Sequence, residues 1–258
     1  MGVDRTVAFV EHMTWDRVEK RIKEGAVAIL PIGAAAKQHG LHLPLDTDRI
    51  QAEWFADRLA RRVSALIWPT ITYGHYPAFA EYAGSVSLSA PVFEATVREI
   101  ATGILAQGCR GLFVLDTGLS TIAPVGRALG GLDRARHLRI HDGPNYLDTT
   151  RRLVEQDHGS HADELETSLM LALAPDLVDM ARAEASLAAR HAAPGPLTPS
   201  DTTSANYSRS GSFGDPTLAT REKGEIMLAA IIDDLSEQVA ALLAATAGES
   251  RNPAPGVS

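Results

Sequence analysis

The stretch LPIGAAAKQHGLHLPLDTD, residues 30–48, decides the fold. An apolar run at residues 26–32 is typical of a buried strand, the chain turns polar at Gly33, and a helix is expected to begin near Thr47. Loops that follow such strands hold ligands and catalytic groups in α/β sheets. This loop carries imidazoles and carboxylates, the groups that bind zinc, manganese or iron, together with one lysine: Lys37, His39, His42, Asp46 and Asp48. On spacing alone, an ordinary polar connection is the alternative.

Strands and helices alternate along the rest of the chain. Further strands are predicted at residues 65–69, 111–115 and 138–140. Helical patterns lie at residues 14–25, 47–63, 89–108, 164–173 and 217–247. This alternation predicts a three-layer α/β/α sandwich with a mainly parallel central sheet. We expect one domain over residues 1–247, a long loop at 191–216, and a disordered tail at 248–258.

Composition narrows the class of protein. The 258 residues, 45% hydrophobic and 22% charged, are enough for one large α/β domain. A net charge of −8 argues against nucleic-acid or anionic-membrane partners, which call for a basic surface. Cys109 is the only cysteine, so no internal disulfide is expected. With no apolar run of about 20 residues and no signal-peptide pattern, these features favour a cytoplasmic protein.

Residues 37–48, KQHGLHLPLDTD, resemble the signature of the creatininase (creatinine amidohydrolase) family. That signature is a glycine-rich turn followed by Glu-Gln-His-Gly-x-His-Leu-Pro-Leu-x-Thr-Asp, and the chain departs from it only at Lys37, where the family has glutamate. Members of the family bind two divalent metals and hydrolyse C–N bonds in small cyclic amides, formamides or peptides. The glutamate is a metal ligand in them.

Two further family landmarks have counterparts here. The landmark Asn-Gly-His-Gly-Gly-Asn ends a strand, and residues 113–121, FVLDTGLST, keep only Gly118 of it. Leu119 stands where the family has a metal-binding histidine. The landmark His-Ala-Gly-Glu-x-Glu-Thr-Ser corresponds to residues 161–168, HADELETS. With weaker matches elsewhere, the resemblance extends over residues 26–224.

The resemblance implies a reduced metal site. In the family, each of the two metals has ligands that it does not share with the other metal. One metal would lose both such ligands here, because Lys37 and Leu119 stand at those positions. The other keeps His39, Asp48 and Glu166, so the resemblance implies one divalent metal, zinc or manganese, or none. Lys37 is interpreted as a cationic surrogate for the lost metal, paired with Asp48 or Glu166. A catalytic base or Schiff-base nucleophile is the other reading of this lysine.

The remaining candidates surround these ligands. The resemblance implies that His161 lies by the substrate and takes part in catalysis, with Lys37 and Glu164 as further catalytic candidates. An acidic first helical turn, favoured by the macrodipole, is the structural alternative for both Glu164 and Glu166. Candidates for substrate binding are His75, Tyr76, Asp116 and Ser120. Asp116 is also a candidate partner for Lys37, and an exposed loop is the alternative for His75 and Tyr76.

Together these observations predict a metal-dependent amidohydrolase that acts on a non-peptide C–N bond of a small cyclic amide or formamide, with at most a mononuclear site. The alternative is a catalytically degenerate or metal-independent member that binds a small molecule or supports a partner subunit, with Lys37 replacing the lost metal. A small-molecule substrate is expected, without nucleic-acid or membrane partners. The resemblance implies a homo-oligomer, a hexamer built from dimers.

Overall fold

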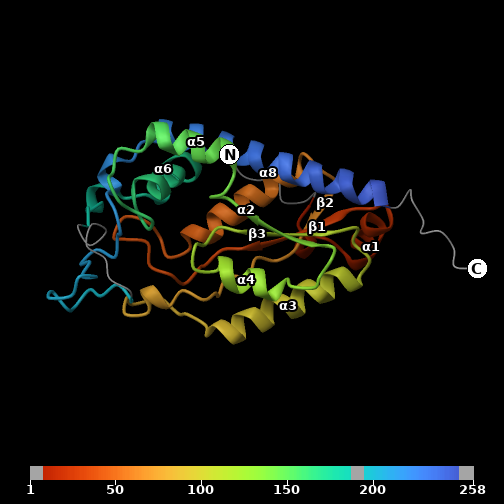
Figure 1. Cartoon of the computed structure of the whole chain (residues 1–258), viewed down its shortest axis with the longest axis horizontal. Coiled ribbons are helices and arrows are strands. Elements are labelled where there is room, and N and C mark those ends of the chain that lie inside the picture. The colour runs from red at the N-terminus through yellow and green to blue at the C-terminus, as the bar shows by residue number, and fades with distance from the viewer. Residues whose placement is uncertain (1–7, 187–194, 250–258) are drawn as a thin grey trace, which may run out of the picture.

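A parallel sheet lies between two layers of helices (Figure 1) in the computed structural model, which describes residues 8–186 and 195–249. The strands are β1 (Val27–Ile32), β2 (Ala65–Ile67), β3 (Leu112–Asp116) and β4 (Ala135–Arg139). Their order in the sheet is β2-β1-β3-β4, and all three pairings are parallel. The carboxyl ends of β1 and β3 therefore lie side by side, with Ile32 opposite Asp116.

Helices cover both faces of the sheet. On one face lie α2 (Thr47–Ala60), α5 (Pro144–Leu153), α6 (Glu164–Leu173) and α8 (Arg221–Glu249). On the other lie α3 (Ala90–Ala106) and α4 (Ile122–Ala128), while α1 (Trp15–Lys23) lies at one end. Short 3-10 turns complete the described elements: η1 (Val10–His12), η2 (Pro77–Phe79), η3 (Pro175–Leu177), η4 (Met180–Arg182) and η5 (Pro216–Leu218).

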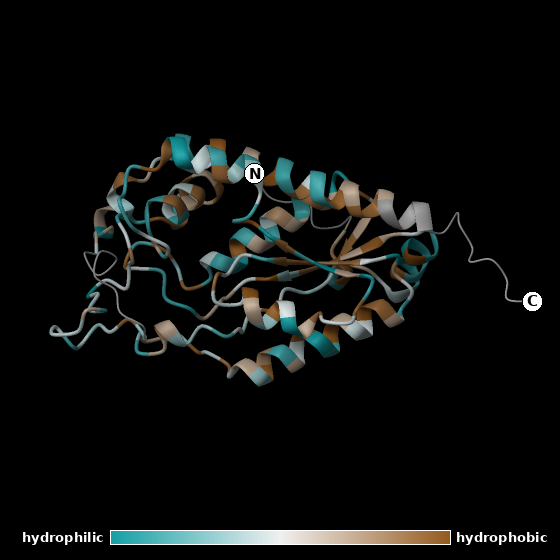
Figure 2. Cartoon of the chain, in the orientation of Figure 1, coloured by the Kyte–Doolittle hydropathy of each residue, from teal (hydrophilic) through white to brown (hydrophobic). Residues whose placement is uncertain are grey.

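The core consists of two apolar clusters, one on each face of the sheet. Successive side chains of a strand point to opposite faces, so Ile29 packs in one cluster and Ala28 and Leu30 pack in the other. Because both faces are covered, β1 is buried along its whole length and apolar throughout. Figure 2 shows a largely brown, hydrophobic centre of the sheet between helices that carry both colours.

The α/β sandwich with a parallel sheet confirms the predicted fold class. The prediction missed α4 and α5, and it began the last helix at Thr217. That helix begins at Arg221, because Pro216 opens a separate 3-10 turn, whose N-cap Asp215 accepts from the backbone N–H of Thr217. The expected tail at 248–258 lies outside the described residues except for its first two positions, which belong to α8, and residues 191–194 of the predicted loop also lie outside them.

A glycine brings the first turn of α2 against the loop that follows β1. A Cβ atom at Gly33 would collide with the backbone carbonyl oxygen of Asp48, so no larger residue fits there without a shift of the backbone. Asp48, in the first turn of α2, is thereby held at the carboxyl end of β1. Side chains at this end of the sheet can share one site.

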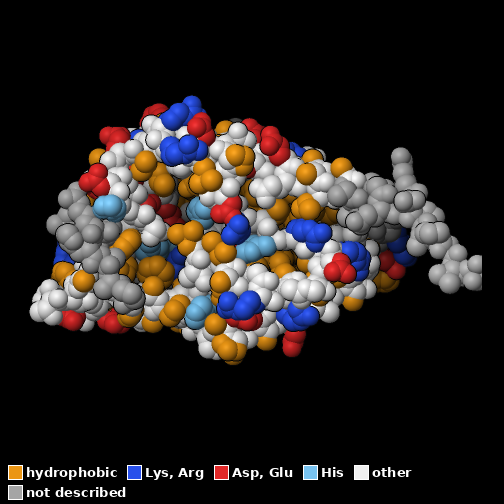
Figure 3. All heavy atoms as spheres, viewed as in Figure 1, with side chains coloured by type: hydrophobic (Ala, Val, Ile, Leu, Met, Phe, Trp, Pro, Cys, Tyr) orange, Lys and Arg blue, Asp and Glu red, His pale blue; other side chains and the backbone are white. Residues whose placement is uncertain are grey.

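The surface carries both signs of charge. On the face in Figure 3, acidic and basic side chains are interspersed, and histidine side chains show between hydrophobic ones. Within the described ranges, none of the helices combines the length and apolar character needed to cross a bilayer.

Candidate metal centre

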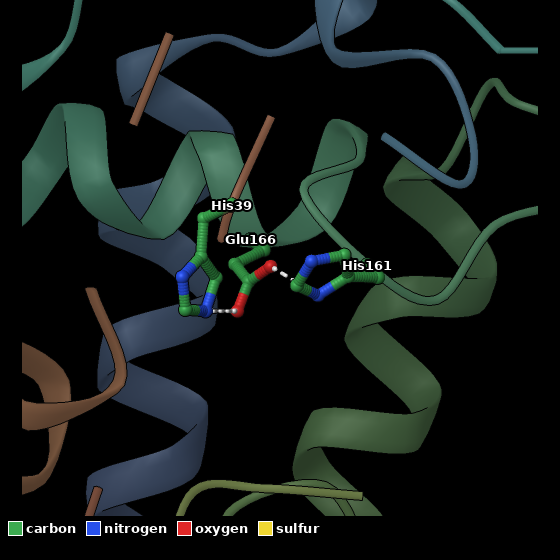
Figure 4. A group of neighbouring side chains, drawn as sticks. All are labelled: His39, His161 and Glu166. Carbon is green, nitrogen blue, oxygen red and sulfur yellow. Dashed lines mark ion pairs between the residues drawn. The ribbon is translucent and has the colours of Figure 1, made fainter. Parts of the chain in front are cut away.

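Glu166 lies between two imidazole rings (Figure 4). His39 Nε2 is 3.6 Å from one oxygen of its carboxylate, and His161 Nδ1 is 3.7 Å from the other. The ligand atoms of these three residues all lie within 4.8 Å of one another. The loop after β1 supplies His39, and the turn before α6 and the first turn of that helix supply His161 and Glu166, so segments more than 100 residues apart in sequence form one compact group of nitrogen and oxygen donors.

Backbone carbonyl groups fix the protonation of both rings. His39 Nδ1 lies 2.9 Å from the carbonyl oxygen of Lys37, and His161 Nε2 lies 2.8 Å from that of Gln38. A carbonyl oxygen only accepts, so each of these nitrogens carries the proton. Burial, then the charges of Lys37 and His39, lower the pKa of His161 well below its ordinary value, and its ring is neutral. Its Nδ1 therefore directs a lone pair at Glu166.

Asp48 joins this group through both of its oxygens. One oxygen lies 2.7 Å from Lys37 Nζ and the other lies 3.1 Å from His39 Nε2. All three side chains are buried. Burial alone would raise the pKa of Asp48, but the positive charge of Lys37 and then His39 outweigh it and hold that pKa well below its usual range. Asp48 is therefore ionised, and of the carboxylates considered as partners for Lys37 it is the one that pairs with the lysine.

The donor set fits one divalent metal ion. A neutral His39 ring with its proton on Nδ1 would direct its Nε2 lone pair at carboxylate oxygens of Asp48 and Glu166, an arrangement that repels unless a cation lies there. A second proton on the ring or a metal ion would meet that need. Imidazole nitrogen held by a carbonyl on its far side, together with carboxylate oxygen, is a common environment for zinc and manganese. The donor atoms of His39, His161 and Glu166 lie close enough together to hold an ion, and Asp48 contacts His39 Nε2 beside them.

The turn before α6 places His161 and Glu166. Ala162 has a φ of +45°, the one positive value at a non-glycine among the residues described. Its backbone N–H donates to Glu166 across 2.6 Å. Asp163 then caps α6 by accepting from the N–H groups of Leu165 and Glu166. Burial raises the pKa of Asp163 to about 6.

A pocket of about 310 Å³ opens beside the centre. Lys37, Asp48, His161 and Glu166 are among its lining residues, and so is Ser120. Residues that the sequence analysis missed complete much of the wall: Gln51, Phe79, His141, Tyr146, Leu165 and Leu169.

Two of the missed wall residues had a signal in the sequence. His141 follows β4 in the chain, and the carboxyl end of a strand is where site residues gather. Gln51 lies three residues after Asp48, on the same side of a helix.

The predicted substrate-binding residues are only partly brought together. Tyr76 is buried and lines a smaller cavity with Lys37, Asp48 and Asp116, and Ser120 lines both this cavity and the pocket. The Asp116 carboxylate accepts from Gly118, Thr121 and His137, whereas Lys37 pairs with Asp48. His75 is half-buried outside both linings, with Nδ1 2.9 Å from the carbonyl oxygen of Leu88.

Glu164 lies apart from the pocket lining. Its carboxylate is fully buried, 2.6 Å from Lys223 Nζ, and it accepts from the backbone N–H groups of Glu155 and Gln156. These contacts tie the first turn of α6 to α8 and to the segment that precedes the site.

Comparisons with known proteins agree on one family. The sequence model of the family described as creatininase, creatinine amidohydrolase, matches residues 11–239. The creatinine amidohydrolase of Pseudomonas putida is 28% identical in a match that covers 90% of this chain and 95% of that protein. The mycofactocin precursor peptide peptidase of Mycobacterium tuberculosis is 31% identical, covering 82% of this chain and 84% of its own length. A solved structure described as a manganese creatininase superposes with a TM-score of 0.76 at 25% identity, covering 90% of this chain and 97% of that one.

Proposed function

The chain belongs to the creatininase family, whose members are amidohydrolases, and from this premise we propose that it hydrolyses a non-peptide C–N bond of a small cyclic amide or formamide with one bound divalent metal. One observation carries the proposal. Two buried imidazoles, each held by a backbone carbonyl on one nitrogen, direct their other nitrogens at the same carboxylate, Glu166. This geometry suits a metal centre better than a core packing role.

The residues have separate roles in this proposal. His39, Asp48 and Glu166 would hold the ion, manganese or zinc, which when bound supplies Lewis acidity to a carbonyl oxygen and to water. Lys37 keeps Asp48 ionised and supplies positive charge where the family signature has a further ligand. Neutral His161, with its free Nδ1 facing the site, would accept a proton from the attacking water and return it to the leaving nitrogen.

The pocket limits the size of the substrate. A volume of about 310 Å³ is near the lower end of the range for small-molecule sites, roughly 300–1,000 Å³. Its walls combine apolar and aromatic side chains, such as Phe79 and Leu169, with the polar group at the centre. This favours a small cyclic amide or formamide over a long peptide. A homo-oligomeric state, hexameric as in the family, and a cytoplasmic location are parts of the same proposal.

The test joins metal analysis to a hydrolysis assay. Purified protein should carry up to one equivalent of zinc or manganese, and it should release carboxylate from at least one of a panel of cyclic amides and N-formyl compounds. Glu166→Gln should lose the metal and His161→Gln should lose turnover, by roughly 100-fold or more. His12→Gln, at an exposed histidine on η1, is the matched control and should change neither. Full turnover in His161→Gln would refute its assigned role.

The close Lys37–Asp48 pair also favours the alternative, a member that works without metal. In that case, protein dialysed against a chelator would keep its ligand binding or activity, and borohydride would trap a carbonyl substrate on the lysine if it forms a Schiff base. Loss of function on chelation, restored by zinc or manganese, would exclude this alternative.

A further inference from the structure

A buried amide next to the metal centre has an unused hydrogen-bond donor. The Gln51 side chain is 2% exposed, and its Nε2 has no hydrogen-bond partner within residues 8–186 and 195–249. The residue lies one turn after Asp48 on α2, so both side chains lie on the same side of the helix.

A buried amide without a hydrogen-bond acceptor destabilises the folded protein. Leaving a buried donor without an acceptor costs about 1–3 kcal/mol, and native proteins leave few such groups unpaired. Gln51 lines the 310 Å³ pocket together with Lys37, Asp48, His161 and Glu166. A ligand in that pocket can supply the missing acceptor, because the amide and the candidate reacting groups face the same space.

We propose that Gln51 is a specificity-determining residue that donates a hydrogen bond to a second carbonyl oxygen of the substrate. The first carbonyl group of the substrate is the one that faces the metal centre, and this part rests on the proposed function. A donor requires an acceptor on the ligand. With the divalent ion of the proposed function bound, that ion and Lys37 balance the three carboxylates that line the pocket, those of Asp48, Asp163 and Glu166, so a neutral carbonyl oxygen is the acceptor that we assign to the ligand.

The spacing indicates the class of substrate. Residues three apart on a helix have Cβ atoms about 5–6 Å apart, which is the scale of a small ring. A cyclic imide or ureide presents two carbonyl groups on such a ring, one for the centre beside Asp48 and one for Gln51. A lactam presents one carbonyl and leaves the amide of Gln51 unpaired. The site should therefore prefer imides and ureides over lactams of the same ring size.

The first test uses two probes of equal ring size, succinimide with two carbonyl groups and 2-pyrrolidinone with one. Binding to the zinc-supplemented full chain is measured by titration calorimetry. The parent should bind succinimide about tenfold more tightly, the effect of one hydrogen bond. Gln51→Leu should bind both probes alike, and Gln107→Leu, at an exposed glutamine after α3, should keep the preference. Equal binding by the parent, failure to bind either probe, or a preference that survives in Gln51→Leu would overturn the proposal.

The second test needs no ligand. In metal-free protein, Gln51→Leu should melt at or above the parent temperature, by up to about 2–4 °C, because the variant removes an unpaired buried donor. A melting temperature several degrees lower would mean that the amide serves the fold, and would overturn the proposal. Hydrolysis is scored separately. Preferential binding without turnover would refute the amidohydrolase and keep the role of Gln51, whereas turnover without preference would do the reverse.

Discussion

Lys37 Nζ lies 2.7 Å from Asp48 Oδ2, and both side chains are buried at the carboxyl end of β1. The Lys37 ammonium group thus forms an ion pair with a carboxylate that the family signature assigns to a metal centre. A lysine holds one positive charge and coordinates nothing, so it can balance a carboxylate without requiring the ligands that a second ion would need. This pair agrees with the proposed centre for one metal ion.

Replacing the lysine should destabilise the protein. Lys37→Met leaves the buried Asp48 without its closest cation, and removing one partner of a buried pair costs about 3–5 kcal/mol. The free energy of unfolding, measured by denaturant titration of metal-free protein, should fall by that order at pH 7. Lys20→Met, at an exposed lysine of α1, is the control and should change it little.

The same substitution has a pH signature. The pKa of Asp48 is lower in the folded protein than in the unfolded chain, where it is about 3.9. This difference stabilises the folded protein at pH values above about 3.9, and the stabilisation is lost as the pH falls. In Lys37→Met, the Asp48 carboxyl group takes up a proton at higher pH than in the parent, and this removes the cost of burying its charge. The difference between variant and parent should therefore shrink from pH 7 towards pH 4. A difference of the same size at both pH values would contradict the charge-pair account.

Metal content should not exceed one equivalent per chain. In the proposed centre, Asp48, His39 and Glu166 would hold one ion, while Lys37 and the half-exposed Leu119 would offer no ligand to a second. Elemental analysis after gentle purification measures the stoichiometry directly. The double substitution Lys37→Glu with Leu119→His should raise it towards two, whereas Lys37→Met with Leu119→His should not. Two equivalents in the parent would contradict the prediction.

The backbone at Ala162 predicts an unusual response to glycine. Its φ of +45° is strained for a residue with a Cβ atom, so Ala162→Gly should raise the free energy of unfolding by about 0.5–1 kcal/mol. Ala95→Gly, at an exposed position inside α3, should lower it by a similar amount. Thermal or denaturant unfolding of the two variants would show opposite signs. A loss of stability in both would mean that position 162 is not strained.

His42 should make the protein sensitive to mild acid. Its ring is buried, with Nε2 2.8 Å from Thr167 Oγ1, and burial, then the charge of His39, lowers its pKa to about 4. A histidine whose folded pKa lies below its unfolded value, about 6.5, loses stability as the pH falls between the two. At pH 5 this loss is about 2 kcal/mol relative to pH 8.

The check compares unfolding at pH 8 and pH 5 in the presence of a chelator. His42→Gln cannot gain the proton, so its stability should fall less across this interval than that of the parent. His12→Gln, at an exposed histidine, should follow the parent. Parallel losses in the parent and His42→Gln would contradict the assignment.

Local patterns predicted the elements whose signals are strong. The run that became β1 is apolar throughout, and the helix predicted at residues 164–173 is α6, whose N-cap Asp163 accepts from two backbone N–H groups. The missed helix α4 contains both Pro124 and Gly126, which disfavour a helix, and its packing against α3 and the sheet overrides that preference. The missed helix α5 did have helix signals that the prediction did not use, namely Pro144 at its first position and Arg151 and Arg152 in its last turn.

The candidate site could be predicted only in part for a similar reason. Family signatures indicated His39, Asp48 and Glu166, and the structure brings them together across more than 100 residues of sequence. Contacts made after folding, such as the partners of Asp116 or the ion pair between Glu164 and Lys223, leave no periodic pattern. Tertiary packing decides which polar groups face the pocket, and local patterns in the sequence do not show it.

The position of α8 in the chain has a consequence for biosynthesis. This helix is the last one described, yet Met227, Ile231, Leu235 and Val239 pack into the apolar cluster on its face of the sheet, and Lys223 clamps the start of α6. During translation at about 5–20 residues per second, the earlier strands emerge seconds before the segment that covers them. The nascent chain therefore passes through an interval in which α2, α5 and α6 have been made but the helix that completes their cluster has not, when binding by a chaperone would protect the exposed apolar side chains from aggregation.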